Sequence, residues 1–359
     1  MLFIPIQQLK SGMKLSEDVL VFENSNARLL TKGTILTERF VEGLRRFRIP
    51  GVYLRDEITG DIMPSKPILT ARSKNKTLKN IEWIFQHTEQ ESKSRTVNYL
   101  KHIDKTVLEL VSLIQQDKSK RINISDLKEY DEYTFHHSLS VAVISIAIGS
   151  KMGMAEDELR RLGFSAIMHD IGKMDVPIEI INKTDKLTNE EFEIIKSHPD
   201  CSSMYLAHNG VKDEDILLTV RSHHEKYDGS GYPNGLKGEE ISLHSRIISV
   251  ADVYDALTSF RPYRDPMMQH KVTEFIMSKC GTEFDTEVVT AFINKIEFYP
   301  VGSFVELSNG KKAVVIGHVN QLRPIVRTID RPHKTLDLFS DSKTYRIVIQ
   351  KNFDNVSTA

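Results

Sequence analysis

The N-terminal part of the chain, residues 1–68, mixes two kinds of apolar pattern. Short apolar stretches at residues 2–6 and 52–54 predict strands, whereas residues 36–47 have the three- and four-residue spacing of an amphipathic helix with Thr37 as its N-cap. The mixture predicts a small α+β N-terminal domain with a regulatory or docking role.

Residues 69–120 are predicted to form a helical linker, because residues 74–120 contain neither Gly nor Pro. Apolar side chains recur there at alternating spacings of three and four residues, at Leu100, Ile103, Val107, Leu110 and Ile114. This seam covers about two heptads, fewer than the three or four that are typical of a coiled coil. Two interpretations stay open: a helix packed on its own chain, or a homodimer formed through a helix over residues 76–118.

The central part, residues 121–298, shows helical periodicity almost throughout. The predicted helices cover residues 132–152, 156–170, 190–197, 213–223, 245–259, 271–279 and 287–296. Thr188 and Glu191 fit a capping box at the start of the third of these. One Gly-rich loop, from Asp228 to Gly238, interrupts the helices. We expect an all-helical domain here.

After Tyr299-Pro300 the apolar period changes to two. Residues 303–307, 313–316, 325–328, 336–338 and 345–349 are predicted strands of an antiparallel sheet, with Asn309-Gly310 as a hairpin turn. Residues 299–359 are therefore expected to form a β-rich C-terminal extension. The fold class of the whole chain is predicted to be mainly α.

Composition and charge narrow the possible partners. The 359 residues include 48 Lys and Arg against 49 Asp and Glu, a net charge of −1 that argues against bulk nucleic-acid binding. No apolar run approaches the ~18 residues that span a bilayer, and no signal peptide is evident, so no membrane association is expected. Two cysteines, Cys201 and Cys280, cannot form a disulfide framework, which favours the cytoplasm.

Two apolar runs of the central part end in acidic residues. Residues 164–168 lead into His169-Asp170, and residues 247–251 lead into Asp252. A carboxylate in such a place is costly to bury unless it is paired or binds a cation. The same helical region adds four imidazoles, those of His137, His198, His223 and His224. Imidazoles with carboxylates suit transition metals such as Fe, Mn, Ni or Zn, and seven candidates exceed the needs of one ion, so a two-metal site is expected.

At this point the residues resemble a known family. The motifs are Tyr133-Thr134-x-x-His137-Ser138, His169-Asp170-Ile171-Gly172-Lys173, His198-Pro199, His223-His224-Glu225, Asp228-Gly229-Ser230-Gly231-Tyr232-Pro233 and Arg261-Pro262-Tyr263-Arg264. Their order and content resemble the HD-GYP phosphodiesterases, a bacterial branch of the HD superfamily that hydrolyses cyclic di-GMP. The resemblance covers residues 121–298 and implies an HD-type helical catalytic domain.

The resemblance implies a role for each matching residue. The implied ligands of two divalent transition metal ions are His137, His169, Asp170, His198, His223, His224 and Asp252. Fe or Mn is the expected metal, with Ni, Co or Zn as alternatives, and Asp170 is expected to bridge the two ions. The implied catalytic residues are His169, Asp170 and Lys173. The implied substrate-binding residues are Lys173, Arg261, Arg264 and Tyr232, and the two guanidinium groups suit phosphate oxygens.

The implied reaction is attack of a metal-bridging hydroxide on a phosphodiester of cyclic di-GMP, giving pGpG, GMP or both. Two alternatives stay open: hydrolysis of another cyclic dinucleotide such as 3′,3′-cGAMP, or a receptor or scaffold that binds cyclic di-GMP without turnover. GGDEF-domain proteins are expected partners through the Gly-Tyr-Pro loop. Glu225 and Asp255 are candidate carboxylates for orienting the imidazoles.

Two positions depart from the family pattern. Tyr133 stands where a Glu supplies a ligand in family members with three metals, so two metals per chain are expected here. Phe260 stands where an Asp usually precedes the Arg-Pro-Tyr-Arg run, at the expected mouth of the site.

Overall fold

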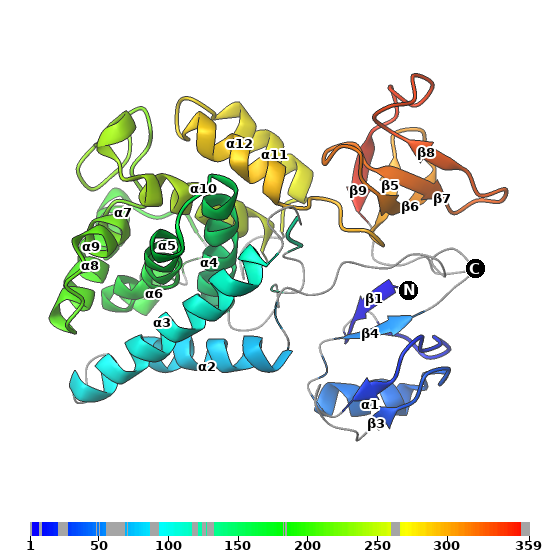
Figure 1. The fold of residues 1–359 in the computed structure, drawn as a ribbon, viewed down its shortest axis with the longest axis horizontal. Coiled ribbons are helices and arrows are strands. Elements are labelled where there is room, and N and C mark those ends of the chain that lie inside the picture. The colour runs from blue at the N-terminus through cyan, green and yellow to red at the C-terminus, as the bar shows by residue number, and fades with distance from the viewer. Residues whose placement is uncertain are drawn as a thin grey trace. The chain divides into compact units, whose positions relative to one another are not determined.

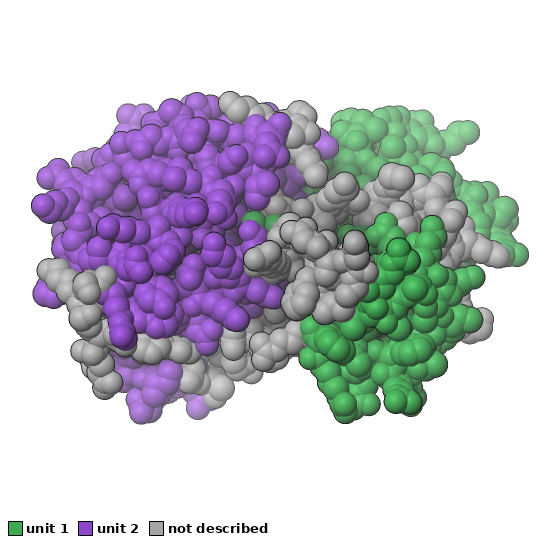
Figure 2. Space-filling view, turned by 60° about the horizontal axis from the view of Figure 1, so that its bottom comes forward, with its two compact units in different colours: residues 1–72, 297–359 green, residues 73–296 purple. Residues whose placement is uncertain are grey.

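The computed structural model describes residues 2–6, 9–20, 28–47, 49, 51–54, 69, 71–86, 93–116, 121–123, 127, 133–181, 183, 185–259 and 266–352. The chain divides into two compact units, shown in different colours in Figure 2. One unit comprises residues 1–72 and 297–359, and the other comprises residues 73–296. The finer division into four segments stays a prediction.

The second unit is helical, as the fold class predicted (Figure 1). Its helices in the described residues are α2 (Ala71–Gln86), α3 (Lys93–Gln115), α4 (Tyr133–Lys151), α5 (Glu156–Met168), α6 (Ile178–Ile181), α7 (Asn189–Lys196), α8 (His198–His208), α9 (Glu214–Arg221), α10 (Leu243–Thr258), α11 (Gln269–Ser278) and α12 (Thr286–Lys295), with a 3₁₀ turn at Ile171–Asp175. Within the described part of this unit, no helix is long and apolar enough to cross a membrane.

Helix α4 is the centre of this unit. All its side chains from residue 136 to residue 150 are buried, and it packs against α5, α10 and α12 (Figure 1). A helix that is buried on every face needs neighbours on every face, which explains why apolar residues predominate over residues 139–148. Helix α5, which leads into His169-Asp170, and helix α10, which carries Asp252, are both among these neighbours.

The apolar seam of α3 is buried within the chain. Leu100, Ile103, Val107, Leu110 and Ile114 are each at most 6% exposed, and α3 packs against α4 and α5. The structure therefore agrees with the first of the two interpretations, in which the helix packs on its own chain. A homodimer through this seam would require side chains that already lie in the chain's own core.

The predicted helices of residues 121–298 begin and end within about two residues of the observed ones, but the pattern missed the one-turn helix α6 and helix α8. Helix α8 was not predicted, because its buried residues include His198, Pro199 and Ser202 and so give no apolar stripe. Pro199 lies in the first turn of α8, where its missing N–H costs nothing. This helix is one wall of the site described below.

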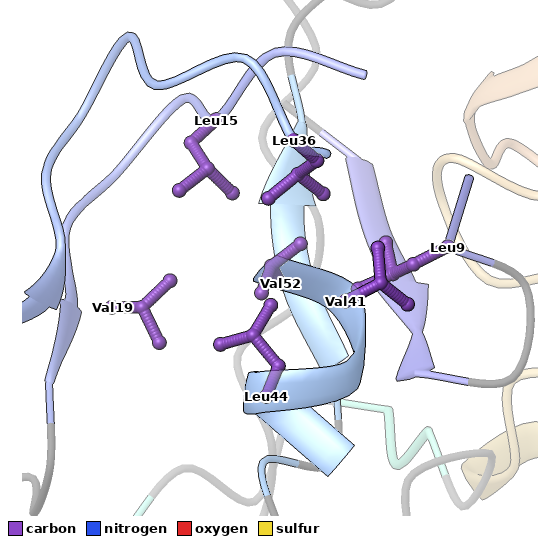
Figure 3. Close-up of a cluster of buried hydrophobic side chains, with 7 residues drawn as sticks. All are labelled: Leu9, Leu15, Val19, Leu36, Val41, Leu44 and Val52. Carbon is purple, nitrogen blue, oxygen red and sulfur yellow. The ribbon is translucent and has the colours of Figure 1, made fainter. Parts of the chain in front are cut away.

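The N-terminal residues form a small α+β fold, as predicted. Strand β1 (Leu2–Pro5) pairs antiparallel with β4 (Gly51–Leu54), and β2 (Val19–Leu20) pairs antiparallel with β3 (Arg28–Leu30). Helix α1 (Glu38–Arg46) begins at Thr37, whose Oγ1 accepts the Phe40 N–H at 3.3 Å. The core of this N-terminal fold is apolar (Figure 3) and consists of Leu9, Leu15, Val19, Leu36, Val41, Leu44 and Val52.

The C-terminal residues form a five-stranded antiparallel sheet in the order β8-β7-β6-β5-β9. Its strands are β5 (Phe304–Leu307), β6 (Lys312–Gly317), β7 (Ile325–Thr328), β8 (Thr335–Asp337) and β9 (Ile349–Asn352). Gly310 has a φ of 77° in the turn between β5 and β6, where the hairpin was predicted.

The prediction of a strand at residues 345–349 was wrong for most of its length, because β9 begins only at Ile349. The backbone just before β9 is held by a side chain instead. The Arg323 guanidinium donates to the carbonyl oxygens of Tyr345 and Ile347, at 2.7 and 3.1 Å. These carbonyls are satisfied without a neighbouring strand.

Candidate metal centre

Three histidines of the centre lie where helices end. His169 is the C-cap of α5, His198 follows the C-cap of α7, and His223 follows the C-cap of α9. In each, Nδ1 donates to the carbonyl oxygen three residues earlier; these acceptors are Ala166 at 2.8 Å, Ile195 at 2.6 Å and Val220 at 2.6 Å. The last carbonyls of a helix have no partner within it, so the imidazoles satisfy them. With the Nδ1 proton fixed in this way, Nε2 is directed away from the helix end.

His137 is oriented by a carboxyl group instead. It lies in the second turn of α4, and its Nδ1 is 2.8 Å from Asp255 Oδ2 on α10. Ser259 Oγ donates to the other oxygen of Asp255 at 3.2 Å. His137 Nε2 consequently faces Asp252, at 3.2 Å from Oδ1. Asp255 therefore orients an imidazole, as the sequence suggested.

The seven residues with implied ligand roles form two neighbouring groups, in each of which the ligand atoms lie within 4.8 Å of one another. One group is Asp170, His198, His223 and His224, and the other is His137, His169 and Asp252.

Asp170 lies between the two groups. Its Oδ2 is 3.4 Å from His169 Nε2 and 3.8 Å from His137 Nε2. Its Oδ1 is 3.3 Å from His198 Nε2 and 3.9 Å from His223 Nε2. One carboxylate thus turns one oxygen to each group, which is the geometry that a bridging ligand requires.

The donor atoms of both groups fit cations. The Nε2 atoms of His198 and His223 are 3.3 Å apart, a distance at which they can share one proton at most. Among the described residues, His169 Nε2 and Asp170 Oδ1 are buried and have no hydrogen-bond partner. Buried acceptors without donors are costly, and a divalent ion would satisfy them together. Neither cysteine belongs to these groups, so the donors are nitrogen and oxygen.

The electrostatics of the centre favour metal ligation at neutral pH. Burial lowers the pKa of His223 and His169, and that of His224 to about 3, so these imidazoles are neutral. Burial alone would raise the pKa of Asp170, but nearby His169 and Lys173 hold it well below its usual range. Neutral imidazoles and ionised carboxylates are the forms that bind metals.

His137 differs from the other imidazoles. Burial lowers its pKa, but hydrogen bonds to Asp252 and Asp255 outweigh that effect and raise the pKa to about 9. This imidazole therefore carries a second proton at neutral pH, which a metal ion at Nε2 would have to displace.

The residues expected to bind substrate are placed only in part. Lys173 Nζ is 2.5 Å from Asp170 Oδ2, and its side chain is one-third exposed. The Tyr232 ring stacks on the His224 ring, with centroids 4.8 Å apart. Burial and the charges of Asp252 and Asp170 raise the pKa of Tyr232, so its phenol stays protonated. Arg261 and Arg264 lie outside the described residues, as do Phe260 and the side chain of Tyr133.

The proposed role of Glu225 as an imidazole partner was wrong. The carboxylate is buried, and its two oxygens accept the backbone N–H groups of Asn234 at 2.7 Å and Leu236 at 3.1 Å. It therefore holds the Gly-Tyr-Pro loop in place. The loop is close to the centre because it is tied to the residue that follows His224.

Two residues that sequence reasoning did not assign hold the His169-Asp170 turn against α8. Ser202 Oγ accepts the Gly172 N–H at 2.8 Å and donates to the His169 carbonyl at 2.8 Å. A Cβ at Gly172 would lie 2.3 Å from the carbonyl oxygen of His198. In the sequence, only the presence of a glycine at position 172 indicates this close approach, and it does not indicate that α8 is the partner.

Comparisons with known proteins agree with this arrangement. A family model described as an HD domain matches residues 83–288. A cyclic di-GMP phosphodiesterase of Pseudomonas aeruginosa is 34% identical over 256 residues, which are 69% of this chain and 62% of the relative. A 3′3′-cGAMP-specific phosphodiesterase of Vibrio cholerae is 35% identical over 179 residues, which are 49% of this chain and 41% of the relative. The chain thus spans less than two thirds of either relative.

A solved structure shares the fold. An HDG"Y"P protein from Bdellovibrio bacteriovorus aligns with a TM-score of 0.51 at 18% identity, over 81% of this chain and 97% of that one. The matched range 83–288 is more than half of the 359 residues and includes both ligand groups. The resemblance stated from the motifs is confirmed, and the chain belongs to the HD domain family.

Proposed function

We propose that the chain is a metal-dependent phosphodiesterase that hydrolyses cyclic di-GMP to pGpG, GMP or both. The observation that carries the proposal is the position of Asp170, whose two oxygens face two separate groups of imidazoles. Two divalent ions supply a nucleophile at neutral pH by lowering the pKa of water, and they offset charge on a phosphate. Fe or Mn suits these nitrogen and oxygen donors, with Ni, Co or Zn as alternatives.

The chain's own residues hold these ions and bind the substrate. The seven residues of the two groups are the proposed ligands, and Asp255 keeps His137 Nε2 directed at them. Lys173, which is one-third exposed beside Asp170, is proposed to contact a non-bridging phosphate oxygen and stabilise its charge in the transition state. Arg261 and Arg264 stay predicted phosphate contacts.

The substrate is proposed from the relatives, several of which are named cyclic di-GMP phosphodiesterases. The similar identity of a cGAMP-specific relative makes 3′,3′-cGAMP the second candidate. Both compounds contain guanine and a 3′–5′ phosphodiester. A receptor without turnover is less favoured, because none of the seven implied ligands is replaced. Cytoplasmic location and GGDEF-domain partners at the Gly-Tyr-Pro loop stay predictions.

One experiment tests the proposal directly. Protein purified without oxygen is analysed for metals and then incubated with a panel of cyclic dinucleotides, and the products are separated by chromatography. We expect two metals per chain and release of pGpG or GMP from cyclic di-GMP. Metal-loaded protein that binds the compound but leaves it intact would support the receptor instead, and cleavage of 3′,3′-cGAMP alone would change the substrate.

A further inference from the structure

An exposed aromatic ring lies beside the centre. Phe192 on α7 is 44% exposed. Its ring meets the Tyr232 ring edge to face, with centroids 6.5 Å apart. Tyr232 in turn stacks on His224, one of the proposed ligands. Aromatic contacts therefore lead from the metal centre to an open surface.

The side-chain ammonium of a lysine lies over both rings. Lys196 Nζ is 4.8 Å from the centroid of Phe192 and 5.8 Å from that of Tyr232. Its acidic partner is Glu193, at 2.7 Å, whose side chain is 68% exposed. Ion pairs in such exposed positions contribute little, so the ammonium can exchange Glu193 for another acceptor at small cost.

Helix α7 is fixed relative to the centre at both ends. At its start, Thr188 and Glu191 form the predicted capping box, and Lys183 binds the Glu191 carboxylate at 2.6 Å. At its end, its C-cap Ser197 directly precedes His198. Phe192 and Lys196 therefore project from a helix that leads straight into a proposed ligand, so their positions are set before any ligand arrives.

We propose that Phe192 and Lys196 form a subsite for a purine base of the cyclic dinucleotide, an inference that rests on the proposed function. The base stacks on the exposed ring of Phe192, because every base has a π-face that an aromatic side chain can cover. The Lys196 ammonium donates to O6 and N7 of guanine. Adenine has an amino donor in place of O6, so this lysine favours guanine over adenine.

The chain offers a matched control for this pair. Phe275 on α11 is 37% exposed, and Lys279 Nζ lies 5.9 Å from its ring centroid. Lys279 pairs with Glu283 at 2.8 Å, as Lys196 pairs with Glu193. The same residue types at the same spacing thus occur at the C-terminal end of α11, which carries none of the seven proposed ligands. If the first pair were only a surface contact, both pairs would respond alike to substitution.

Steady-state kinetics on cyclic di-GMP test the stacking role. Phe192→Leu should raise KM about 5-fold to 100-fold with a much smaller change in kcat, because stacking contributes equally to substrate and transition state. Phe192→Trp should restore KM, and Phe275→Leu should leave it at the wild-type value. Metal content is measured for each variant, because α7 leads into His198. An unchanged KM in fully loaded Phe192→Leu would overturn the subsite.

The base preference is tested by binding. Calorimetry with pGpG and pApA on metal-loaded protein should show that Lys196→Gln loses preference for the guanine compound, whereas Lys279→Gln retains it. Equal preference in wild type and Lys196→Gln would remove the lysine from the proposal. The wild-type protein distinguishes failure of the proposed function from failure of the base subsite. If the wild-type protein cleaves neither cyclic di-GMP nor bis(p-nitrophenyl) phosphate, the phosphodiesterase assignment fails, whatever the variants bind.

Discussion

Removing the Asp255 carboxyl group should weaken metal binding although Asp255 touches no metal in our proposal. Asp255 is 1% exposed, and its Oδ2 accepts the Nδ1 proton of His137 at 2.8 Å. In Asp255→Ala the imidazole loses the partner that fixes its ring orientation and its tautomer. Loss of such a partner typically lowers metal affinity about 10- to 100-fold. That range equals about 1.4–2.7 kcal/mol, which agrees with the value of a hydrogen bond to a charged group.

The assay is a competition between the protein and a chelator of known affinity, read as bound metal per chain. Asp255→Asn should recover part of the loss, because its amide oxygen can still accept from His137 Nδ1. Asp157→Ala is the control, since Asp157 is 59% exposed and its ion pairs with Arg160 and Arg161 lie near the surface, where such pairs contribute little. Wild-type affinity and wild-type kcat in Asp255→Ala would refute the orienting role.

Three further predictions concern the same centre. Asp170→Ala should remove metal from both groups and lower turnover by several orders of magnitude while the far-UV circular dichroism is retained; full metal content would contradict the bridging role. Gly172→Ala should lower the free energy of unfolding by about 1–3 kcal/mol, because the new Cβ would overlap the backbone of α8. Gly43→Ala is the control and should not lower it, because a Cβ at Gly43 would meet open space. Chemical denaturation measures both variants. The pKa of His137 is about 9, so a metal ion at this group must displace a proton. Affinity for that ion should therefore increase about tenfold for each unit by which the pH is raised, up to about pH 9. Calorimetry in two buffers of different ionisation enthalpy should count one proton released, and a pH-independent affinity would exclude this step.

The candidate ligands could be selected from the sequence because a carboxylate at the end of an apolar run is costly to bury unless it is paired or binds a cation. The sequence nevertheless offers helix capping and metal ligation as alternatives for a histidine at a helix end. His169, His198 and His223 show that one imidazole can serve both roles, since Nδ1 satisfies a helix carbonyl and leaves Nε2 directed at the centre. A pattern of residue types cannot show this, because it depends on which ring nitrogen faces the helix.

The parts that the sequence could not predict depend on distant contacts. Periodicity identified the apolar seam of α3 but not the helices that cover it. Helix α8 gave no apolar stripe, because part of its buried face is polar and binds the turn at Gly172. Glu225 follows two ligands in sequence, yet its carboxylate binds loop amides nine and eleven residues further on. Each of these outcomes was decided by a partner that local spacing does not reveal.

The charge of the centre explains why cations must precede the substrate. Helices α5 and α9 direct their C termini at the centre, and a helix C terminus carries a partial negative charge. At the junction of α7 and α8, the C terminus of α7 and the N terminus of α8 meet, so their partial charges have opposite sign. Among the residues that the structure describes at the centre, three buried carboxyl groups, those of Asp170, Asp252 and Asp255, face one lysine, Lys173, and one protonated imidazole, that of His137. Without divalent ions these groups together carry a negative charge, which disfavours a phosphate.

Metal removal should therefore abolish binding of the dinucleotide as well as its cleavage. Protein stripped with a chelator should show no calorimetric binding of pGpG at concentrations where metal-loaded protein is saturated, and addition of Mn²⁺ should restore it. The base subsite at Phe192 and Lys196 cannot compensate, since stacking of one base offers only about 1–3 kcal/mol. Undiminished binding by stripped protein would mean that recognition depends on the protein alone, which is the behaviour expected of the receptor and not of the phosphodiesterase.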